Sequence, residues 1–268
     1  MGAFVAALVA LLLILSVPPQ PAPRGVPAPS VGPLSGRALP IPPEEELRYS
    51  FGWQDAPAAT VSLRYRTGAG AHRQHLEVSY HVATTAAVDW LWSFRATGTT
   101  LIDAETLLPV AATITTREKD REKQRRTTFD HRRGVATIDE FKAYKDERDR
   151  DVIAAPSAHD VASALVAVRV MRPPAALTVL VGDDLYEVTV RQRGSGRVEV
   201  PAGTFDAHEW SLEVRELDED LPEEARTARY RSGKVWVARR SRLPLRLEAE
   251  VFVGRITAEL VSRRPQAP

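Results

Sequence analysis

Apolar and polar residues alternate in short runs from Leu47 to the end of the chain. This is the period of β-strands with one buried face. In the first run, Leu47, Tyr49, Phe51 and Trp53 would share one face. Further strands are predicted at 60–66, 72–82, 88–94, 134–138, 177–182, 185–193, 197–201, 205–217, 227–239, 244–252 and 254–263.

The run at 88–94, VDWLWSF, is the densest apolar feature of the chain. As a strand it would present Val88, Trp90, Trp92 and Phe94 on one face, because side chains two apart point the same way. We therefore predict an aromatic wall at this place.

Two charged segments follow. Between Arg117 and Arg125 the odd positions are basic and the even positions 118, 120 and 122 are acidic, with Thr, Ile and Phe on either side. This favours a long exposed hairpin with its tip near 119–122, since the flanking residues are strand formers. The segment 139–151 is predicted to be an exposed connection.

One helix is predicted after Ser157, which would cap it with Asp160 answering three residues later. Apolar residues recur at helical spacing from Val161 to Met171, and prolines 173 and 174 end the pattern. Turns are predicted at 182–184, 194–196, 201–203 and 242–244. Short strands at this spacing indicate one β domain at 44–268, a sandwich, half-barrel or barrel.

The N-terminal region has a different composition. Residues 3–15 are an unbroken apolar run, typical of a signal peptide and shorter than a bilayer span. We predict a signal peptide or a retained N-terminal anchor at 1–17, with cleavage left open. Residues 18–43 hold ten of the twenty prolines and would form an extended linker. An exported protein of the periplasm or cell envelope is expected, near the membrane through this segment.

Overall composition narrows the class of function. The chain has 36 basic and 35 acidic side chains, giving a net charge of +1. This balance argues against a nucleic-acid partner, which normally meets a clear basic excess. The absence of cysteine excludes disulfides, thiolate metal sites and a cysteine nucleophile.

No catalytic, cofactor or metal residue is predicted. Ser157, His159 and Asp160 lie within four residues at a helix start, where they cannot act as nucleophile, base and orienting group. His75 and His81 would share a strand face but lie about 20 Å apart at ~3.3 Å per residue. We therefore lean against an enzyme.

The ordered set of segments resembles the family DUF3108, exported bacterial proteins of unknown function. The matching pieces include LRYSFGW, VDWLWSF, SAHDVASALVAVRV, VEVPAGTF and KVWVARRSRLPLRL, spread over residues 46–262. The strand after Gln54 departs from the family by lacking a glycine near its start. The resemblance implies a mainly β fold, a curved antiparallel sheet or incomplete barrel with one covering helix. It implies no activity.

Three functional hypotheses remain open. The first is a non-enzymatic envelope module that binds a lipid-like or other apolar ligand in a cavity between sheet and helix. The second is an envelope scaffold that binds a protein partner, and the third is an enzyme of an unrecognised type. The alternative that the aromatic residues fill an ordinary core also stays open. The residues predicted to contact an apolar ligand are Trp53, Trp90, Trp92, Phe94 and Trp236.

Overall fold

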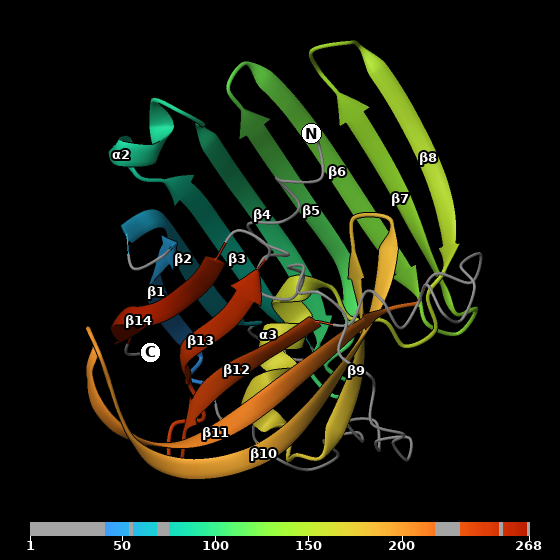
Figure 1. Ribbon diagram of the computed structural model, residues 1–268. Coiled ribbons are helices and arrows are strands. Elements are labelled where there is room, and N and C mark those ends of the chain that lie inside the picture. Colours follow the sequence, from blue (N-terminus) through green and yellow to red (C-terminus); the bar gives the residue numbers. More distant parts are fainter. Residues whose placement is uncertain (1–40, 54–55, 69–74, 218–230, 252–253, 267–268) are drawn as a thin grey trace.

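The computed structural model describes residues 41–53, 56–68, 75–217, 231–251 and 254–266. Within these residues, fourteen antiparallel strands form one sheet, which curves around one long helix and does not close (Figure 1). This confirms the fold class predicted for the chain. The predictions for 1–17 and for most of the linker 18–43 fall outside the described residues.

The strands alternate with short turns along most of the chain. Their bounds are β1 (Glu44–Trp53), β2 (Ala56–Thr67), β3 (His75–Thr84), β4 (Phe94–Asp103), β5 (Pro109–Glu118), β6 (Arg121–Asp130), β7 (Val135–Lys142), β8 (Glu147–Ala154), β9 (Ala175–Val181), β10 (Asp184–Val200), β11 (Gly203–Glu216), β12 (Arg231–Ala238), β13 (Pro244–Val251) and β14 (Gly254–Gln266). The helices are α2 (Ala86–Asp89) and α3 (Val161–Val170).

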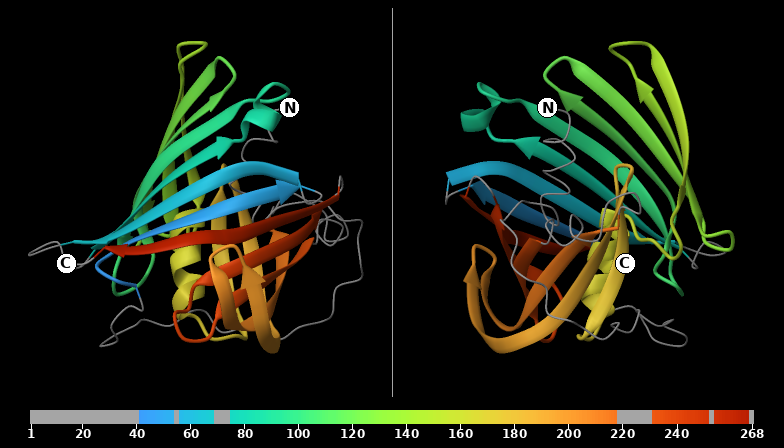
Figure 2. Two further views of the ribbon diagram at one scale, coloured as in Figure 1. Left: turned by 90° about the vertical axis from the view of Figure 1, so that its left-hand side faces the viewer. Right: turned by 45° about the vertical axis from the view of Figure 1, so that its right-hand side comes forward.

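The first and last strands lie at the centre of the sheet. β1 pairs with both β2 and β14, so the order runs β8 to β1 and then β14 to β9. The two edges are therefore β8 and β9, which are consecutive in sequence and joined through α3. Figure 2 shows the two halves of the sheet diverging from β1, β2 and β14, with α3 in the hollow between them.

Helix α3 is fixed at its N-terminus by a reciprocal cap. The Asp160 carboxylate accepts a hydrogen bond from the Ser163 amide at 2.8 Å, and the Ser163 hydroxyl accepts one from the Asp160 amide at 3.0 Å. The cap is therefore Asp160, and the prediction of Ser157 was wrong. Ser157 lies on the surface with φ of 52°, outside the helix.

The helix is held from several sides. Its small residues are buried against the sheet, and a core joins it to β9–β13 and to parts of β1, β2 and β14. Arg169, in its last turn, is fully buried and makes an ion pair with the equally buried Glu45 of β1. The helix therefore packs against β9–β14 and also, through Ala162 and Val166, against β1–β4, while β5–β7 contribute no residue to these cores.

Three local predictions were wrong. Segment 88–94 is not a strand: α2 and a turn occupy 86–91, and β4 begins only at Phe94. Segment 139–151 forms most of β7 and β8, in which charged residues occupy a sheet edge. Residues 194–196 lie inside β10, where a bulge after Gln192 adapts the strand to β11. The hairpin tip at 119–120 and the turns at 182–183 and 201–202 are confirmed, whereas the turn predicted at 242–244 lies at 239–241.

Candidate functional site

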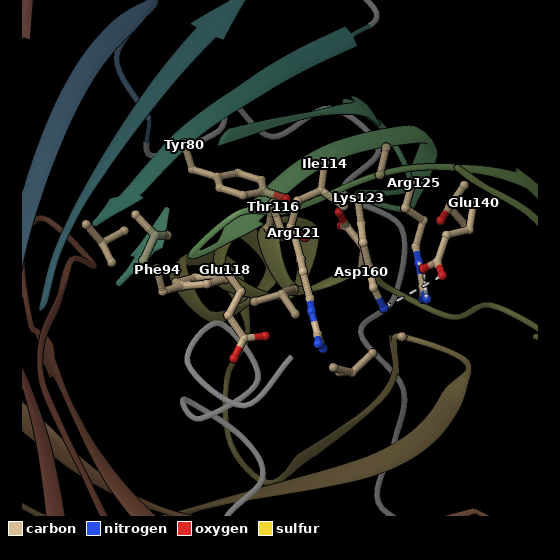
Figure 3. A pocket seen from close by; sticks show the side chains of 18 of the residues that line it. Tyr80, Phe94, Ile114, Thr116, Glu118, Arg121, Lys123, Arg125, Glu140 and Asp160 are labelled. Carbon is tan, nitrogen blue, oxygen red and sulfur yellow. Dashed lines mark hydrogen bonds and ion pairs between the residues drawn. The ribbon is translucent and has the colours of Figure 1, made fainter. Parts of the chain in front are cut away.

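A cavity of about 680 Å³ opens between the concave face of β2–β7 and the elements α3 and β9 (Figure 3). Ligand sites in proteins usually measure ~300–1,000 Å³, so the size suits a small molecule. Helix α3 packs on β9–β14 and on β1–β4, and the cavity lies where β5–β7 curve away from it.

The inner part of the cavity is apolar. Alternation on the strands directs one residue in two inward, so β2 contributes Val61 and Leu63 and β5 contributes Ala112 and Ile114. Helix α3 faces them with Val161, Ala162 and Leu165. Phe51, Val82, Phe129, Leu180 and Val181 complete this apolar surface.

A stacked aromatic pair forms one wall. The rings of Trp92 and Phe94 lie 5.4 Å apart and only 3° from parallel. The Trp92 indole Nε1 donates a hydrogen bond of 2.8 Å to Oε1 of Glu118 on β5. This bond fixes the indole at the mouth and also occupies one oxygen of the nearest carboxylate.

A second, narrow cavity of about 90 Å³ adjoins the first beneath α3. Phe51, Val61, Leu63, Val161 and Leu165 line both. The narrow cavity is otherwise walled by aliphatic residues of α3 and of β9–β14 and by a few partly polar side chains such as Tyr49 and Arg246. The combined space therefore tapers from a broad mouth to a small apolar end.

The mouth carries a row of cations on one strand. Arg121, Lys123 and Arg125 occupy alternate positions of β6 and line the cavity together. Figure 3 shows their side chains extending side by side in the same direction. Cross-strand pairs place Glu118 beside Arg121 and Glu140 beside Arg125. The site is thus apolar toward β2–β4 and charged toward β6.

A buried polar cluster lies where the helix starts. The Thr100 hydroxyl donates to Oδ2 of Asp160 at 2.5 Å, in addition to the cap bond from Ser163. Burial raises the pKa of Asp160 above its usual range. The same cause, with a smaller effect from the Asp160 charge, raises the pKa of Tyr80. Asp160 and Tyr80 therefore face the cavity as largely enclosed groups, and burial favours the neutral form of each.

His159 and Ser163 form another close pair, 3.2 Å between Nδ1 and Oγ. Both are buried, and the Ser163 hydroxyl also takes part in the helix cap. Burial, with a smaller effect from His131, lowers the pKa of His159 to about 4. This pair stabilises the start of α3, and Ser157 is not part of it. Among the described residues, no group of three or more His, Asp or Glu side chains is arranged to hold a metal ion.

The five residues predicted to contact a ligand are separated by the fold. Trp92 and Phe94 line the larger cavity. Trp90 is 82% exposed and Trp53 is 47% exposed, and neither lines a cavity. Trp236 also lies outside both cavities, beneath the Arg246 guanidinium at 5.9 Å. A ligand role for the five stays a prediction, and the geometry favours it only for Trp92 and Phe94.

The sequence interpretation did not include Ile114, Leu165 or the row Arg121, Lys123 and Arg125 in the site. A signal for the row was present, because residues at odd positions of one strand must share a face. What the sequence did not reveal was which face of the hairpin turns inward.

Comparison with known proteins gives a family but no activity. The family model described as "Protein of unknown function (DUF3108)" matches residues 47–261, which confirms the resemblance inferred from the sequence. No curated protein matches the chain.

Solved structures show a related fold. A β-barrel-like protein of the domain of unknown function DUF1849 from Brucella abortus is 10% identical, with a TM-score of 0.55, and the match covers 86% of this chain and 100% of that one. An exported protein of Bacteroides fragilis with a YmcC-like fold is 10% identical, with a TM-score of 0.32 and coverage of 82% and 95%. The lipoprotein YmcC of Escherichia coli is 7% identical, with a TM-score of 0.28 and coverage of 84% and 86%. The first of these supports the fold assignment.

Proposed function

We propose that this chain, which belongs to the DUF3108 family, is a non-enzymatic module of the cell envelope that binds a lipid-like or other apolar ligand. The observation that carries the proposal is the tapering cavity of about 680 Å³ between the sheet and α3, apolar within and charged at its mouth. A cavity of this kind suits a molecule with an apolar body, whose transfer from water contributes ~25 cal/mol per Å² buried.

A binding role fits the polar groups better than catalysis does. An acid–base catalyst needs a group that exchanges protons near the working pH. Burial moves the pKa of Tyr80 and of His159 away from that condition, each in the direction of its neutral form. The Asp160 carboxylate, whose pKa burial raises, accepts hydrogen bonds from the Ser163 amide and the Thr100 hydroxyl. Asp160 and His159 also hold the start of α3, so they serve to shape the cavity.

The proposed location is the periplasm or the envelope, with residues 1–17 as signal peptide or anchor and 18–43 as a linker. The apolar run and the prolines of the sequence support it. No helix among the described residues has the length and apolar character needed to cross a membrane. A domain at 44–268 would then lie close to the bilayer surface, where apolar ligands are abundant.

The test uses the full chain purified from a host with an envelope. Native mass spectrometry with lipid extraction should find an apolar adduct, and the uncharged dye N-phenyl-1-naphthylamine should bind and compete with it. Ile114→Asp puts a charge into the cavity wall, whereas Thr113→Asp puts the same charge on the exposed opposite face of β5. Dye binding should fall at least tenfold in the first variant and stay within twofold in the second.

Ile114→Trp gives a second variant that fills the cavity without adding a charge. It should also weaken dye binding, while urea unfolding shows that the fold remains. If the wild-type chain carries no adduct and binds no dye, or if Ile114→Asp and Thr113→Asp behave alike, the proposed function is wrong.

A second candidate, docking of an envelope protein, is favoured by one rim of the sheet. The turns β1–β2, β3–β4, β5–β6 and β7–β8 lie on the same rim, because the strands are antiparallel neighbours. Among the described residues, four of the six exposed large hydrophobic side chains, Trp53, Trp90, Leu91 and Tyr144, lie there. Clustered exposed apolar residues often mark interaction surfaces.

A photo-crosslinker at Trp90 tests this candidate in the intact envelope. The matched control is Val152 on the edge strand β8, which is 65% exposed and lies away from the rim turns. A defined protein adduct at Trp90 alone would support docking through the rim. Equal labelling at both positions would count against it.

A further inference from the structure

The charged mouth of the cavity is asymmetric. On β6 the residues directed into the cavity are Arg121, Lys123 and Arg125, followed by Thr127 and Phe129. The acidic Glu122 belongs to the opposite face, where it pairs with Arg117 at 2.6 Å. The β5–β6 hairpin therefore directs three cations of β6 into the cavity, and its Arg117–Glu122 ion pair lies on the outer face.

Three carboxylates of the β5–β7 region line the cavity, Glu118, Asp120 and Glu140, and the first and last have side-chain donors. Glu118 accepts the indole N–H of Trp92. Glu140 accepts both Nε and Nη2 of Arg125, at 3.1 Å and 2.7 Å. These bonds lower the pKa of Glu140, although burial opposes them. Both carboxylates thus already accept hydrogen bonds from side chains of the sheet and its adjoining turn.

The three cations of β6 differ in how many hydrogen bonds and ion pairs they already make. Arg125 is taken up by Glu140 and by Asp183, which accepts from Nη1 at 2.9 Å. Lys123 reaches Glu140 only at 4.0 Å, the limit of an ion pair. Arg121 lies 5.6 Å from the centre of the Tyr144 ring, and in the described part of the chain it has no carboxylate within ion-pair distance. Two cations, Arg121 and Lys123, therefore keep most of their hydrogen-bonding capacity for a ligand.

These two cations lie directly across the sheet from the apolar wall. Register pairs join Arg121 to Glu118 and Glu118 to Phe94, and they join Lys123 to Thr116 and Thr116 to Ala96. Neighbouring strands are ~4.8 Å apart, so the backbones of β6 at Arg121 and β4 at Phe94 lie about 10 Å apart across the sheet. A ligand in this space would meet cations on one side and the stacked aromatic pair on the other.

Resting on the proposed function, we infer that the ligand is an anionic single-chain amphiphile. Its acidic head, a carboxylate or a phosphate, binds between Arg121 and Lys123. Its chain crosses the aromatic wall of Trp92 and Phe94 toward Leu165, and the small apolar cavity beneath α3 receives the chain end. The taper to about 90 Å³ favours one chain over two. Hydrogen bonds between charged partners contribute more than neutral ones, so the head would determine selectivity.

The test compares three probes with one chain length: palmitate, hexadecyl phosphate and hexadecanol. Each competes with N-phenyl-1-naphthylamine for the full-length protein at pH 8, below micellar concentration. The wild-type protein should bind at least one of the two anions at least tenfold more tightly than hexadecanol. A preference between palmitate and hexadecyl phosphate tells which acid the site suits better.

The variant Arg121→Gln/Lys123→Gln removes both available cations. The control Arg117→Gln removes a cation from the outer face of the same hairpin, where the side chain is 63% exposed. The double variant should lose the preference for anions and keep its affinity for hexadecanol and for the dye within about twofold. The control should behave as the wild type does.

Each outcome separates the inference from the proposed function. If hexadecanol binds as tightly as both anions, or if Arg117→Gln and the double variant lose anion affinity equally, the head-group inference is wrong and the apolar cavity stands. If neither the dye nor any probe binds, the proposed function fails and the inference fails with it.

Discussion

The buried ion pair between α3 and β1 should be a major determinant of stability. Arg169 Nη1 donates to Oε2 of Glu45 at 2.5 Å, and both side chains are 0% exposed. Arg263 of β14 binds the other oxygen, Oε1, at 2.6 Å. The Arg169 guanidinium also lies 5.4 Å from the centre of the Tyr65 ring. One carboxylate thus joins the helix to the two central strands of the sheet.

The two single substitutions leave different charges exposed to an apolar environment. Glu45→Leu leaves the Arg169 cation in the core without its carboxylate, and losing one partner of a buried pair typically costs ~3–5 kcal/mol. Arg169→Met should cost less, because Glu45 keeps Arg263. Replacing both removes the buried charges together, so the double variant should lie within about 2 kcal/mol of the wild type.

Urea unfolding followed by tryptophan fluorescence measures these free energies by linear extrapolation. The control is Asp139→Leu, which breaks an exposed ion pair with Arg150 and should cost less than ~1 kcal/mol. If Glu45→Leu costs no more than Asp139→Leu, the pair is not a determinant of stability. If the double variant shows the sum of the two single losses, the charges do not interact as described.

Two further predictions concern the cavity wall and pH. Gly98→Ala would place a Cβ against the Tyr80 ring and 2.7 Å from the Thr113 carbonyl oxygen, whereas the Cβ of Gly196→Ala meets nothing within 4 Å. In urea unfolding we expect the first variant to lose ~1–3 kcal/mol of stability and the second to lose none. Equal losses would show that the close approach of Gly98 to Tyr80 and Thr113 does not limit the side chain at this position. Burial lowers the pKa of His159 from 6.5 to about 4, so the stability associated with its neutral form is complete above pH 6.5 and falls by about 3 kcal/mol as the pH drops to 4. His159→Gln should reduce the pH dependence of the unfolding free energy between pH 6.5 and pH 4. An unchanged slope would exclude His159 as the source of this dependence.

Strand positions were the part of the fold that alternation could predict. Leu47, Phe51, Leu63 and Tyr65 alternate with polar neighbours and are buried as expected. One error occurred where the same short run of residues is compatible with both a strand and a helical turn. In 88–94 the spacing of Trp90 and Trp92 suits a strand, yet Ala86 to Asp89 forms a helical turn that links β3 to β4.

Charge was a second source of error. Segment 139–151 is rich in charged residues, which suggested a solvated connection, but edge strands commonly carry charges because these discourage pairing with other chains. Lys142 of β7 donates to Glu147 and Asp149 of β8, at 3.2 Å and 2.5 Å. Cross-strand ion pairs of this kind stabilise β8 in place of an apolar face.

The cavity itself could not be read from the sequence, because a filled core and a lined cavity have the same inward-facing residues. The strand residues Val61 and Ile114 and the helix residue Leu165 would show the same spacing of apolar positions whether or not the helix touched β5. The difference is set by where α3 is anchored. The Arg169–Glu45 pair and the small residues of α3 hold the helix against β9–β14 and against β1–β4, whereas β5–β7 contribute no residue to the two cores that include α3. Residues more than 100 positions apart determine this distance, and local patterns carry no record of it.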